Sequence, residues 1–584
     1  MCGIFAVSGK GNHAGNIILE GLKKLEYRGY DSWGIALRKA GKDAILIEKE
    51  VGKISKVNKE LSPSVEGIGH SRWATHGGVT RENAHPHQVG KVTIVHNGIF
   101  ENFSKHKKQF EAKGTSFCSQ TDSEVIAAIL NSFFEAGFSP EKCITKTAKK
   151  IDGRFAFLAM FEGISGIFAA RRGSPLIIGR GKTETFIASD IPAFLEKTNI
   201  VNYLDDNEMV LVNGTTVNFK NLQTGLPVEK RDIKVPWKVE SAEKGKFPHF
   251  MIKEIFEQKE TIARAINHDE NALNQAISLL KDCNGVFFVA CGTAHKVAMT
   301  AEYFFAEISG RKINVVPASE MPYFERFINK KTAIIAISQS GETADVLEVL
   351  ERGKKAGAKI LSLTNVESSS IARLSDVHIP ILAGPEKAVA STKAATSQMA
   401  LLFLLAYTEV GKTNIAREIL RSTSSSINDF LNERYEAIIQ DVAKTIVKKE
   451  NLFIIGRGDL YPMALEAAIK IQEVSYIHAQ GFSAGELKHG PIALIEKDTP
   501  CLVLGDDLET LSNAVELKSR GAKIIGISPQ RADVFDEWLK IPDCDGAKAI
   551  VTIIPVQILA YHLALLRNID PDMPRNLAKS VTVK

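Results

Sequence analysis

The chain has 584 residues, of which 44% are hydrophobic and 24% are charged, and its formal net charge is +5. This length predicts about three domains, and the composition is typical of a globular protein with several apolar cores. The small net charge, without a basic tail, gives no indication of nucleic-acid binding and is compatible with anionic small-molecule ligands.

The seven cysteines are scattered over the chain, and no two of them form a Cys-x-x-Cys pair. This pattern argues against a disulfide framework or a zinc site and favours a reducing cytoplasm. The first residues lack a basic segment followed by an apolar one, and the longest apolar run, 400–407, is too short to cross a bilayer. We therefore expect a cytoplasmic protein that binds neither membrane nor nucleic acid.

The first part of the chain predicts a β-rich domain. Before about residue 215, short runs of β-forming residues alternate with a few helical stretches such as 122–134, which indicates stacked sheets with flanking helices. The polar segment 219–246 contains two prolines and predicts a linker after a first domain of residues 1–218. From residue 247 on, predicted strands alternate with long helices, as in parallel α/β units.

The second half contains an internal repeat. Residues 286–293 correspond to 451–458, and residues 357–364 correspond to 521–528, at offsets of 165 and 164 residues. Each match is an apolar strand that ends in small or polar residues. We infer two tandem doubly wound parallel-sheet domains, whose ligands bind at the carboxyl ends of the strands. The two domains are expected to cover 247–430 and 431–574.

Cys2 can become a nucleophile that carries its own base. An initiator methionine is usually removed before a small residue, which would leave the thiol of Cys2 beside a free α-amine. The amine titrates near about 7.7–8.0 and the thiol near about 8.5, so the amine can accept the proton of the thiol without a partner histidine. The alternative is an ordinary thiol in a frayed terminus. A substrate pocket in the following hundred residues decides between the two.

Four strings after Cys2 suit the hydrolysis of an amino-acid amide. Arg72 can bind an α-carboxylate through two parallel hydrogen bonds, and Asp122 can bind an α-ammonium group. Asn97 and the backbone N–H of Gly98 can form an oxyanion hole. The alternatives are a tight turn at Asn97 and Gly98, and surface histidines or a metal cluster for the five histidines from His70 to His96. The strings are Arg72-Trp73-Ala74-Thr75-His76-Gly77, Asn83-Ala84-His85-Pro86-His87, His96-Asn97-Gly98-Ile99 and Thr121-Asp122-Ser123-Glu124.

At these residues the chain resembles the N-terminal-nucleophile glutamine amidotransferases. The string 72–77 and the string Tyr27-Arg28-Gly29-Tyr30-Asp31-Ser32 narrow the resemblance to the glucosamine-6-phosphate synthase family. The resemblance implies an αββα sandwich in which Cys2 attacks the side-chain amide of glutamine. It also implies that ammonia passes through an internal channel with Trp73 as its gate. The implied glutamine-site residues are Cys2, Arg72, Trp73, Thr75, His76, Asn97, Gly98 and Asp122.

The string Ser338-Gln339-Ser340-Gly341-Glu342-Thr343 follows a predicted strand and opens a helix. Hydroxyl and N–H groups then converge at a helix N-terminus, which makes a phosphate cradle. A simple N-cap is the alternative, but three hydroxyls and a glycine exceed what a cap needs. The string resembles the phosphosugar-binding signature of the sugar isomerase domains of the same family, as do residues 389–393 and 485–491. The implied sugar-phosphate residues are Thr293, Ser338, Gln339, Ser340, Thr343, Val389 and Ser391.

Glu466, Lys470 and Glu473 lie at positions i, i+4 and i+7, and hence on one helical face. A solvated salt-bridged stripe is the alternative for this face, and a disordered end is the alternative for the tail 575–584. The resemblance implies instead that His489 opens the sugar ring, Lys579 forms a Schiff base with the C2 carbonyl and Glu473 moves a proton between C1 and C2. Lys470 and Glu466 orient these groups, and the tail folds over the site. The resemblance implies no metal and no pyridoxal phosphate.

The resemblance therefore implies transfer of ammonia from glutamine to fructose 6-phosphate and isomerisation to glucosamine 6-phosphate, which begins hexosamine biosynthesis. It also implies a homodimer, in which the histidine matching His489 can come from the neighbouring subunit. Two residues depart from the family: Ala294 replaces a common serine, which is expected to weaken phosphate affinity, and Trp33 replaces a small residue. Another amidotransferase would need a pyrophosphate- or ATP-binding motif, which we do not find. A non-catalytic phosphosugar sensor would not need Glu473, His489 and Lys579.

Overall fold

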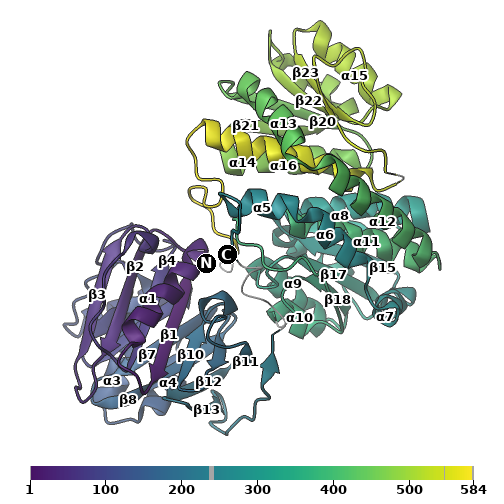
Figure 1. Cartoon of the computed structure of the whole chain (residues 1–584). Helices are drawn as coiled ribbons and strands as arrows, with labels where there is room; N and C mark the ends of the chain where they lie inside the picture. The colour runs from purple at the N-terminus through teal and green to yellow at the C-terminus, as the bar shows by residue number, and fades with distance from the viewer. Residues whose placement is uncertain (1, 236–242, 368, 545, 582–584) are drawn as a thin grey trace. The chain divides into compact units, whose positions relative to one another are not determined.

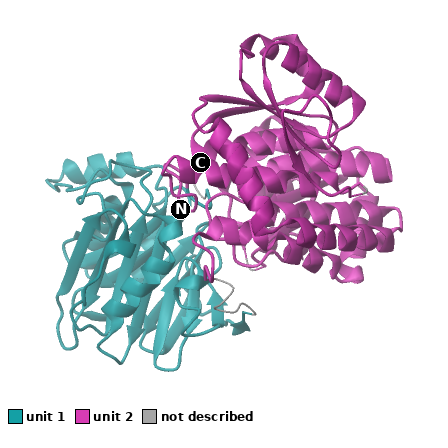
Figure 2. Cartoon of the chain, turned by 45° about the horizontal axis from the view of Figure 1, so that its top comes forward, with its two compact units in different colours: residues 1–242, 578–584 teal, residues 243–577 magenta. Residues whose placement is uncertain are grey.

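The structure is a computed structural model that describes residues 2–235, 243–367, 369–544 and 546–581. The chain divides into two compact units (Figures 1 and 2). The first unit comprises residues 1–242 with 578–584, and the second comprises residues 243–577. Of the predicted linker and tail, residues 236–242 and 582–584 lie outside the described residues.

The first unit contains an antiparallel sheet of eight strands in the order β14-β11-β9-β10-β1-β4-β2-β3 and one of six in the order β13-β12-β8-β7-β6-β5. The first sheet consists of β1 (Gly3–Gly9), β2 (Ser32–Arg38), β3 (Ile45–Val51), β4 (Glu66–Arg72), β9 (Ile177–Arg180), β10 (Glu184–Ala188), β11 (Ile200–Tyr203) and β14 (Ile233–Lys234). The second consists of β5 (His87–Val89), β6 (Val92–Gly98), β7 (Phe155–Phe161), β8 (Ile164–Arg172), β12 (Glu208–Asn213) and β13 (Thr216–Asn221).

The two sheets pack face to face between layers of helices, which confirms the predicted αββα sandwich. β1 shows why, because successive side chains of a strand point to opposite faces. Ile4 of β1 packs with Leu158 of the second sheet, whereas Phe5 packs with Ile18 of α1 (Ala14–Lys24). Helices α3 (Asp122–Glu135) and α4 (Pro140–Ala148) cover the outer face of the second sheet. A further helix of this unit is α2 (Phe103–Glu111).

The first unit extends beyond the predicted boundary at residue 218. Residues 219–221 belong to β13, and β14 adds a short strand to the edge of the first sheet, where Val201 pairs with Ile233. Val235 is buried in the core of this unit. The prediction of a linker beginning at residue 219 is therefore wrong. The physical reason is that both strands lie at sheet edges and most of their side chains are partly or fully exposed, so their sequence is polar.

The second unit contains two parallel five-stranded sheets, β16-β15-β17-β18-β19 and β21-β20-β22-β23-β24. Both have the doubly wound order 2-1-3-4-5, which confirms the predicted repeat. The strands are β15 (Gly285–Ala290), β16 (Asn314–Pro317), β17 (Thr332–Ser338), β18 (Lys359–Thr364), β19 (Val377–Pro380), β20 (Asn451–Gly456), β21 (His478–Ser483), β22 (Pro500–Leu504), β23 (Lys523–Ser528) and β24 (Glu537–Lys540).

The helices of the second unit pack around both sheets (Figure 1). One of them, α16 (Lys548–Leu566), is long and apolar enough to cross a membrane, with a mean hydropathy of 2.0, but 89% of its apolar window is buried inside the protein. The others are α5 (Phe250–Phe256), α6 (Gln258–Ile266), α7 (Glu270–Lys281), α8 (Gly292–Phe304), α9 (Ala344–Lys355), α10 (Ser370–Leu374), α11 (Lys393–Glu409), α12 (Thr413–Phe430), α13 (Glu433–Ile446), α14 (Leu460–Ser475) and α15 (Leu508–Ser519).

Gly481 of β21 is expected to be essential for the packing of α14. A Cβ atom added at Gly481 would lie 2.4 Å from the carbonyl oxygen of Ala464 in α14, a backbone atom that cannot move alone. Gly481→Ala should therefore lower the free energy of unfolding of the second unit by about 1–3 kcal/mol. Gly485→Ala is the matched control, because a Cβ there meets nothing within 4 Å. Equal thermal unfolding of the two variants would contradict the close packing.

Candidate active sites

Cys2 stands directly before β1, at a pocket in the first unit. β1 pairs with β4 with Gly3 opposite Ser71, which places Cys2 beside the end of β4. The backbone N–H of Trp73 donates to Cys2 Sγ over 3.2 Å, and Sγ lies 3.4 Å from the Trp73 carbonyl oxygen. Burial raises the pKa of the Cys2 thiol. The thiol therefore needs a base beside it to react at neutral pH.

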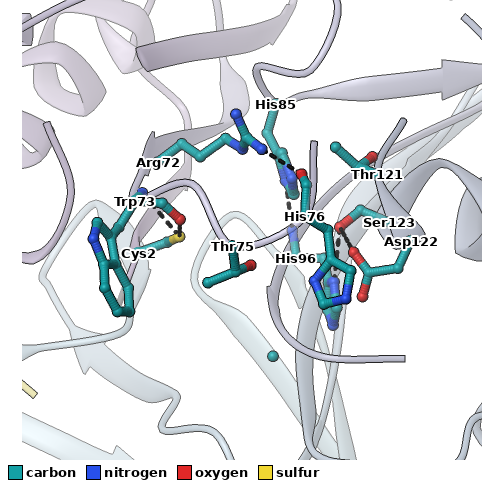
Figure 3. Close-up of a pocket in the computed structure, with 11 residues that line it drawn as sticks. Cys2, Arg72, Trp73, Thr75, His76, His85, His96, Thr121, Asp122 and Ser123 are labelled. Carbon is teal, nitrogen blue, oxygen red and sulfur yellow. Dashed lines mark hydrogen bonds between the residues drawn. The ribbon is translucent and has the colours of Figure 1, made fainter. Parts of the chain in front are cut away.

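The pocket beside Cys2 has a volume of about 30 Å³ and draws its lining from all four predicted strings. In Figure 3, Cys2 and Trp73 lie on one side of the pocket, and Asp122 and Ser123 lie on the other. The structure thus brings together residues that are far apart in the sequence. The lining residues are Cys2, Arg72, Trp73, Thr75, His76, His85, His96, Gly98, Thr121, Asp122 and Ser123.

The two residues predicted to bind the ends of an amino acid are buried and have partners. The guanidinium of Arg72 donates to the carbonyl oxygens of His76, Gly77 and Gly78, and so holds the loop after β4. Asp122, the first residue of α3, accepts the backbone N–H of Phe100 over 2.8 Å. The guanidinium that is predicted to bind a ligand carboxylate therefore also fixes the position of this loop.

Asn97 and Gly98 end β6 and pair with β7, so they do not form a tight turn. The side-chain Nδ2 of Asn97 donates to the carbonyl oxygen of Cys2 over 2.9 Å. Gly98 has a φ of +124°, and an added Cβ would lie 2.0 Å from the Arg154 carbonyl oxygen, which only glycine tolerates. Both residues predicted to supply oxyanion donors therefore lie beside Cys2.

Four of the five histidines form a buried layer at the pocket, and two of them, His85 and His96, line it. They lie neither on the surface nor, in the described part of the chain, in a group able to hold a metal ion. The ring centroids of His70 and His85 lie 4.1 Å apart, and those of His85 and His87 lie 4.6 Å apart. Nδ1 of His96 lies 2.9 Å from Ser123 Oγ. Burial lowers the pKa of all four rings, that of His70 to about 3, so they are neutral at neutral pH.

Arg28 and Asp31 also contact this site, although the sequence predicted no individual role for either residue of the string 27–32. Asp31 Oδ2 accepts the backbone N–H of Ala74 over 2.8 Å, and Arg28 Nε lies 3.4 Å from the carbonyl oxygen of Cys2. A further carboxylate, Asp190, holds Arg28 over 3.0 Å. The signal in the sequence that could have indicated these contacts is the presence of two charged residues among aromatic residues and a glycine.

The predicted phosphate cradle lies between the carboxyl end of β17 and the start of α9. Ser338 Oγ accepts the backbone N–H of Gly341 over 3.1 Å and lies 3.1 Å from Thr343 Oγ1. An added Cβ at Gly341, where φ is +67°, would lie 2.0 Å from Ser369 Oγ. β17 neighbours β15 at the point where the strand order reverses, which is where doubly wound sheets bind ligands.

The loop that carries Val389 and Ser391 is held by the carboxylate of Glu386 and by the backbone of Asp572. Glu386 accepts from Ser391 Oγ over 3.2 Å and from the Thr392 N–H over 2.9 Å. The backbone N–H of Val389 donates to the Asp572 carbonyl oxygen over 3.0 Å. These hydrogen bonds fix the conformation of the loop.

Glu466, Lys470 and Glu473 share one face of α14, on which Glu466 and Lys470 are buried and Glu473 is half-buried, so the face is not a solvated stripe. Lys470 forms ion pairs with Glu466, over 3.3 Å, and with Glu473. Burial raises the pKa of Glu466 to about 7, and its Oε1 accepts from Thr293 Oγ1 over 3.1 Å. Burial opposes the charge of Lys470, but the two carboxylates outweigh it and raise its pKa. The hydroxyl of Thr293 thus links the two repeats of the second unit.

The other predicted sugar-site groups lie elsewhere. His489 ends the 3-10 helix η7 (Ala484–His489) with an exposed side chain and takes no part in the ion pairs of α14. Lys579 belongs to the segment 578–584, which clusters with the first unit. Their roles therefore stay predictions. Of the two departures, Ala294 packs against the core of the second unit and Trp33 is buried in β2.

Comparison with known proteins supports the family resemblance predicted for each of the two units. Residues 76–196 match the family described as "Glutamine amidotransferase domain", and residues 279–407 and 445–567 match the "SIS domain". The glutamine--fructose-6-phosphate aminotransferases [isomerizing] of Thermococcus kodakarensis and Pyrococcus horikoshii are 39% and 40% identical to this chain over 100% of both proteins. The C-terminal domain of glucosamine-fructose-6-phosphate aminotransferase from Francisella tularensis has 33% identity and a TM-score of 0.53, and the match covers 57% of this chain and 99% of that domain.

Acid is expected to destabilise the first unit through the histidine layer. Unfolded histidines bind protons below about pH 6.5, whereas the folded pKa of His70 is about 3. The free energy of unfolding is therefore not reduced by the histidines above pH 6.5. It falls as the pH decreases from 6.5 toward 3, by up to about 1.4 kcal/mol per pH unit for each ring that stays neutral in the folded state. His87→Gln should reduce this slope in urea unfolding between pH 7 and 5. Exposed His13→Gln is the control, and equal slopes for the two variants would contradict the assignment.

Proposed function

The chain belongs to the isomerizing glutamine–fructose-6-phosphate aminotransferase family, and we propose that it uses glutamine to convert fructose 6-phosphate into glucosamine 6-phosphate, with release of glutamate. The observation that supports this most strongly is the pocket beside Cys2, which collects four separate strings suited to amide hydrolysis. The same chain carries two repeats with the fold of sugar isomerase domains.

In the glutaminase half, Cys2 Sγ attacks the side-chain carbonyl carbon of glutamine. Because burial raises the pKa of this thiol, its proton must pass to a neighbouring base. The α-amine of Cys2, once Met1 is removed, is such a base. Asn97 Nδ2 and the Gly98 N–H stabilise the tetrahedral oxyanion. Ammonia then leaves from the intermediate, and water cleaves the resulting thioester to glutamate and restores the thiol.

We propose that glutamine binding moves the loop after β4. The pocket, at about 30 Å³, has room for about one water molecule. Arg72 holds the loop through three carbonyl oxygens, and Asp31 holds it through Ala74. We propose that the α-carboxylate of glutamine takes the place of those carbonyls at Arg72 while Asp122 binds the α-ammonium group. Trp73, next in the chain, would then respond to the presence of glutamine.

In the sugar half, the phosphate of fructose 6-phosphate binds the cradle of residues 338–343, where backbone N–H groups meet a helix N-terminus. His489 opens the ring, and Lys579 condenses with the C2 carbonyl with loss of water. Ammonia then replaces Lys579 at C2, and Glu473 moves the proton between C1 and C2. Lys470 forms ion pairs with Glu473 and Glu466 and so holds the Glu473 carboxylate in position for this step.

We further propose that the protein is a cytoplasmic homodimer. His489 is exposed in the single chain although the proposed mechanism uses it at the sugar site. A second copy that supplies this residue would complete the site. Sedimentation equilibrium tests the stoichiometry, and a monomer that is fully active would overturn it.

Cys2→Ala is expected to abolish both glutamine hydrolysis and glutamine-dependent synthesis, because the attacking sulfur is gone. Mass spectrometry of reactions with glutamine and fructose 6-phosphate should show glutamate and glucosamine 6-phosphate for the natural chain and neither product for Cys2→Ala. Cys118→Ala is the matched control, since Cys118 is exposed and outside the pocket lining. Hydrolysis at the original rate by Cys2→Ala would refute the nucleophile.

Lys579 is expected to form a covalent adduct with the sugar. Borohydride reduces a Schiff base to a stable secondary amine, so treatment in the presence of fructose 6-phosphate should attach the sugar to Lys579, as peptide mapping can show. Lys579→Arg should prevent the adduct and eliminate glucosamine 6-phosphate formation, because a guanidinium stays protonated. An adduct on Lys470 or Lys393 instead would move the Schiff base to that residue.

A further inference from the structure

The side chain of Asn97 is held at both of its polar atoms. Its Nδ2 donates to the carbonyl oxygen of Cys2 over 2.9 Å, and its Oδ1 lies 3.1 Å from Nε2 of His70. An asparagine amide has two orientations that differ by exchange of oxygen and nitrogen, and only hydrogen-bond partners distinguish them. The partner at Oδ1 therefore decides where the N–H groups of Asn97 point.

The contacts of His70 determine its tautomer. Nε2 also lies 3.1 Å from the carbonyl oxygen of His96, which can only accept a hydrogen bond. Nε2 must therefore carry the hydrogen, and it faces Asn97 as a donor. The opposite amide orientation would place N–H against N–H at His70 and oxygen against oxygen at Cys2. Only one orientation of Asn97 satisfies both neighbours.

His70 is itself fixed in place. Its side chain is fully buried, and its ring stacks on His85 with an angle of 14° between the planes. His70 lies on β4 of the first sheet, whereas Asn97 lies on β6 of the second. The hydrogen bond thus joins the sheet that carries Cys2 to the sheet that carries the oxyanion donors.

We propose that His70 is a positioning residue for glutamine hydrolysis, which spans the two sheets and turns the N–H groups of Asn97 toward Cys2. The inference rests on the proposed role of Asn97 as an oxyanion donor. Because an oxyanion forms only in the transition state, loss of this orientation should lower kcat for hydrolysis and leave KM almost unchanged. A purely structural role would not give this separation.

The test compares two variants of the full-length protein that lose the ring equally. His70→Gln keeps an N–H donor at the reach of Nε2, whereas His70→Asn is one methylene too short to reach Asn97. We expect kcat for glutamine hydrolysis to fall by about 10²-fold in His70→Asn, close to the loss of one oxyanion donor, and at least 10-fold less in His70→Gln. Equal kcat values in these two variants, or a change confined to KM, would overturn the proposal.

Asn97→Ala separates this proposal from the one on which it rests. If Asn97→Ala leaves kcat unchanged, the oxyanion role itself fails. If Asn97→Ala lowers kcat, the double variant His70→Asn with Asn97→Ala should be no slower than Asn97→Ala, because His70 then has no amide to orient. Additive losses in the double variant would show that His70 acts by another route and would refute the positioning role.

Discussion

The antiparallel pairing of β1 with β4 is the constraint on which the first site depends. It places the residue before β1, Cys2, next to the end of β4, so that Trp73, which follows β4, donates its backbone N–H to the thiol. The pairing also fixes which face of β1 meets the second sheet. Because Asn97 belongs to that second sheet, Cys2 and Asn97 come together only when the two sheets pack against each other.

The two sites solve the burial of ionisable groups in opposite ways. The histidine layer of the first unit stays neutral, because a positive charge on a buried ring would lose its hydration, which costs free energy. The face of α14 instead buries a lysine between two carboxylates, which satisfies most of the charge locally. One carboxyl oxygen of Glu466 has no protein partner in the described structure. Neutral groups suit a site that needs fixed hydrogen bonds, and charged groups suit one that moves protons.

Much of this organisation could be predicted from the sequence. The doubly wound repeat follows from the match between 286–293 and 451–458, because strand and turn patterns are local, and the strings around Cys2 identify the pocket residues. Contacts between distant parts of the chain could not be predicted in this way. Nothing local reveals that His70 contacts Asn97, since the contact depends on how two sheets pack. The predicted boundary at residue 218 failed because edge strands have the polarity of loops.

The edge position of β13 and β14 bears on how the glutaminase half can be handled separately. A gene fragment that ends at residue 218 would cut β13 and remove β14, leaving β12 and β11 with unpaired backbone N–H and C=O groups. Exposed strand edges of this kind recruit strands from other molecules. A fragment that continues to residue 235 retains both edge strands and the buried Val235. The choice of end point thus determines whether the isolated half stays in solution or aggregates.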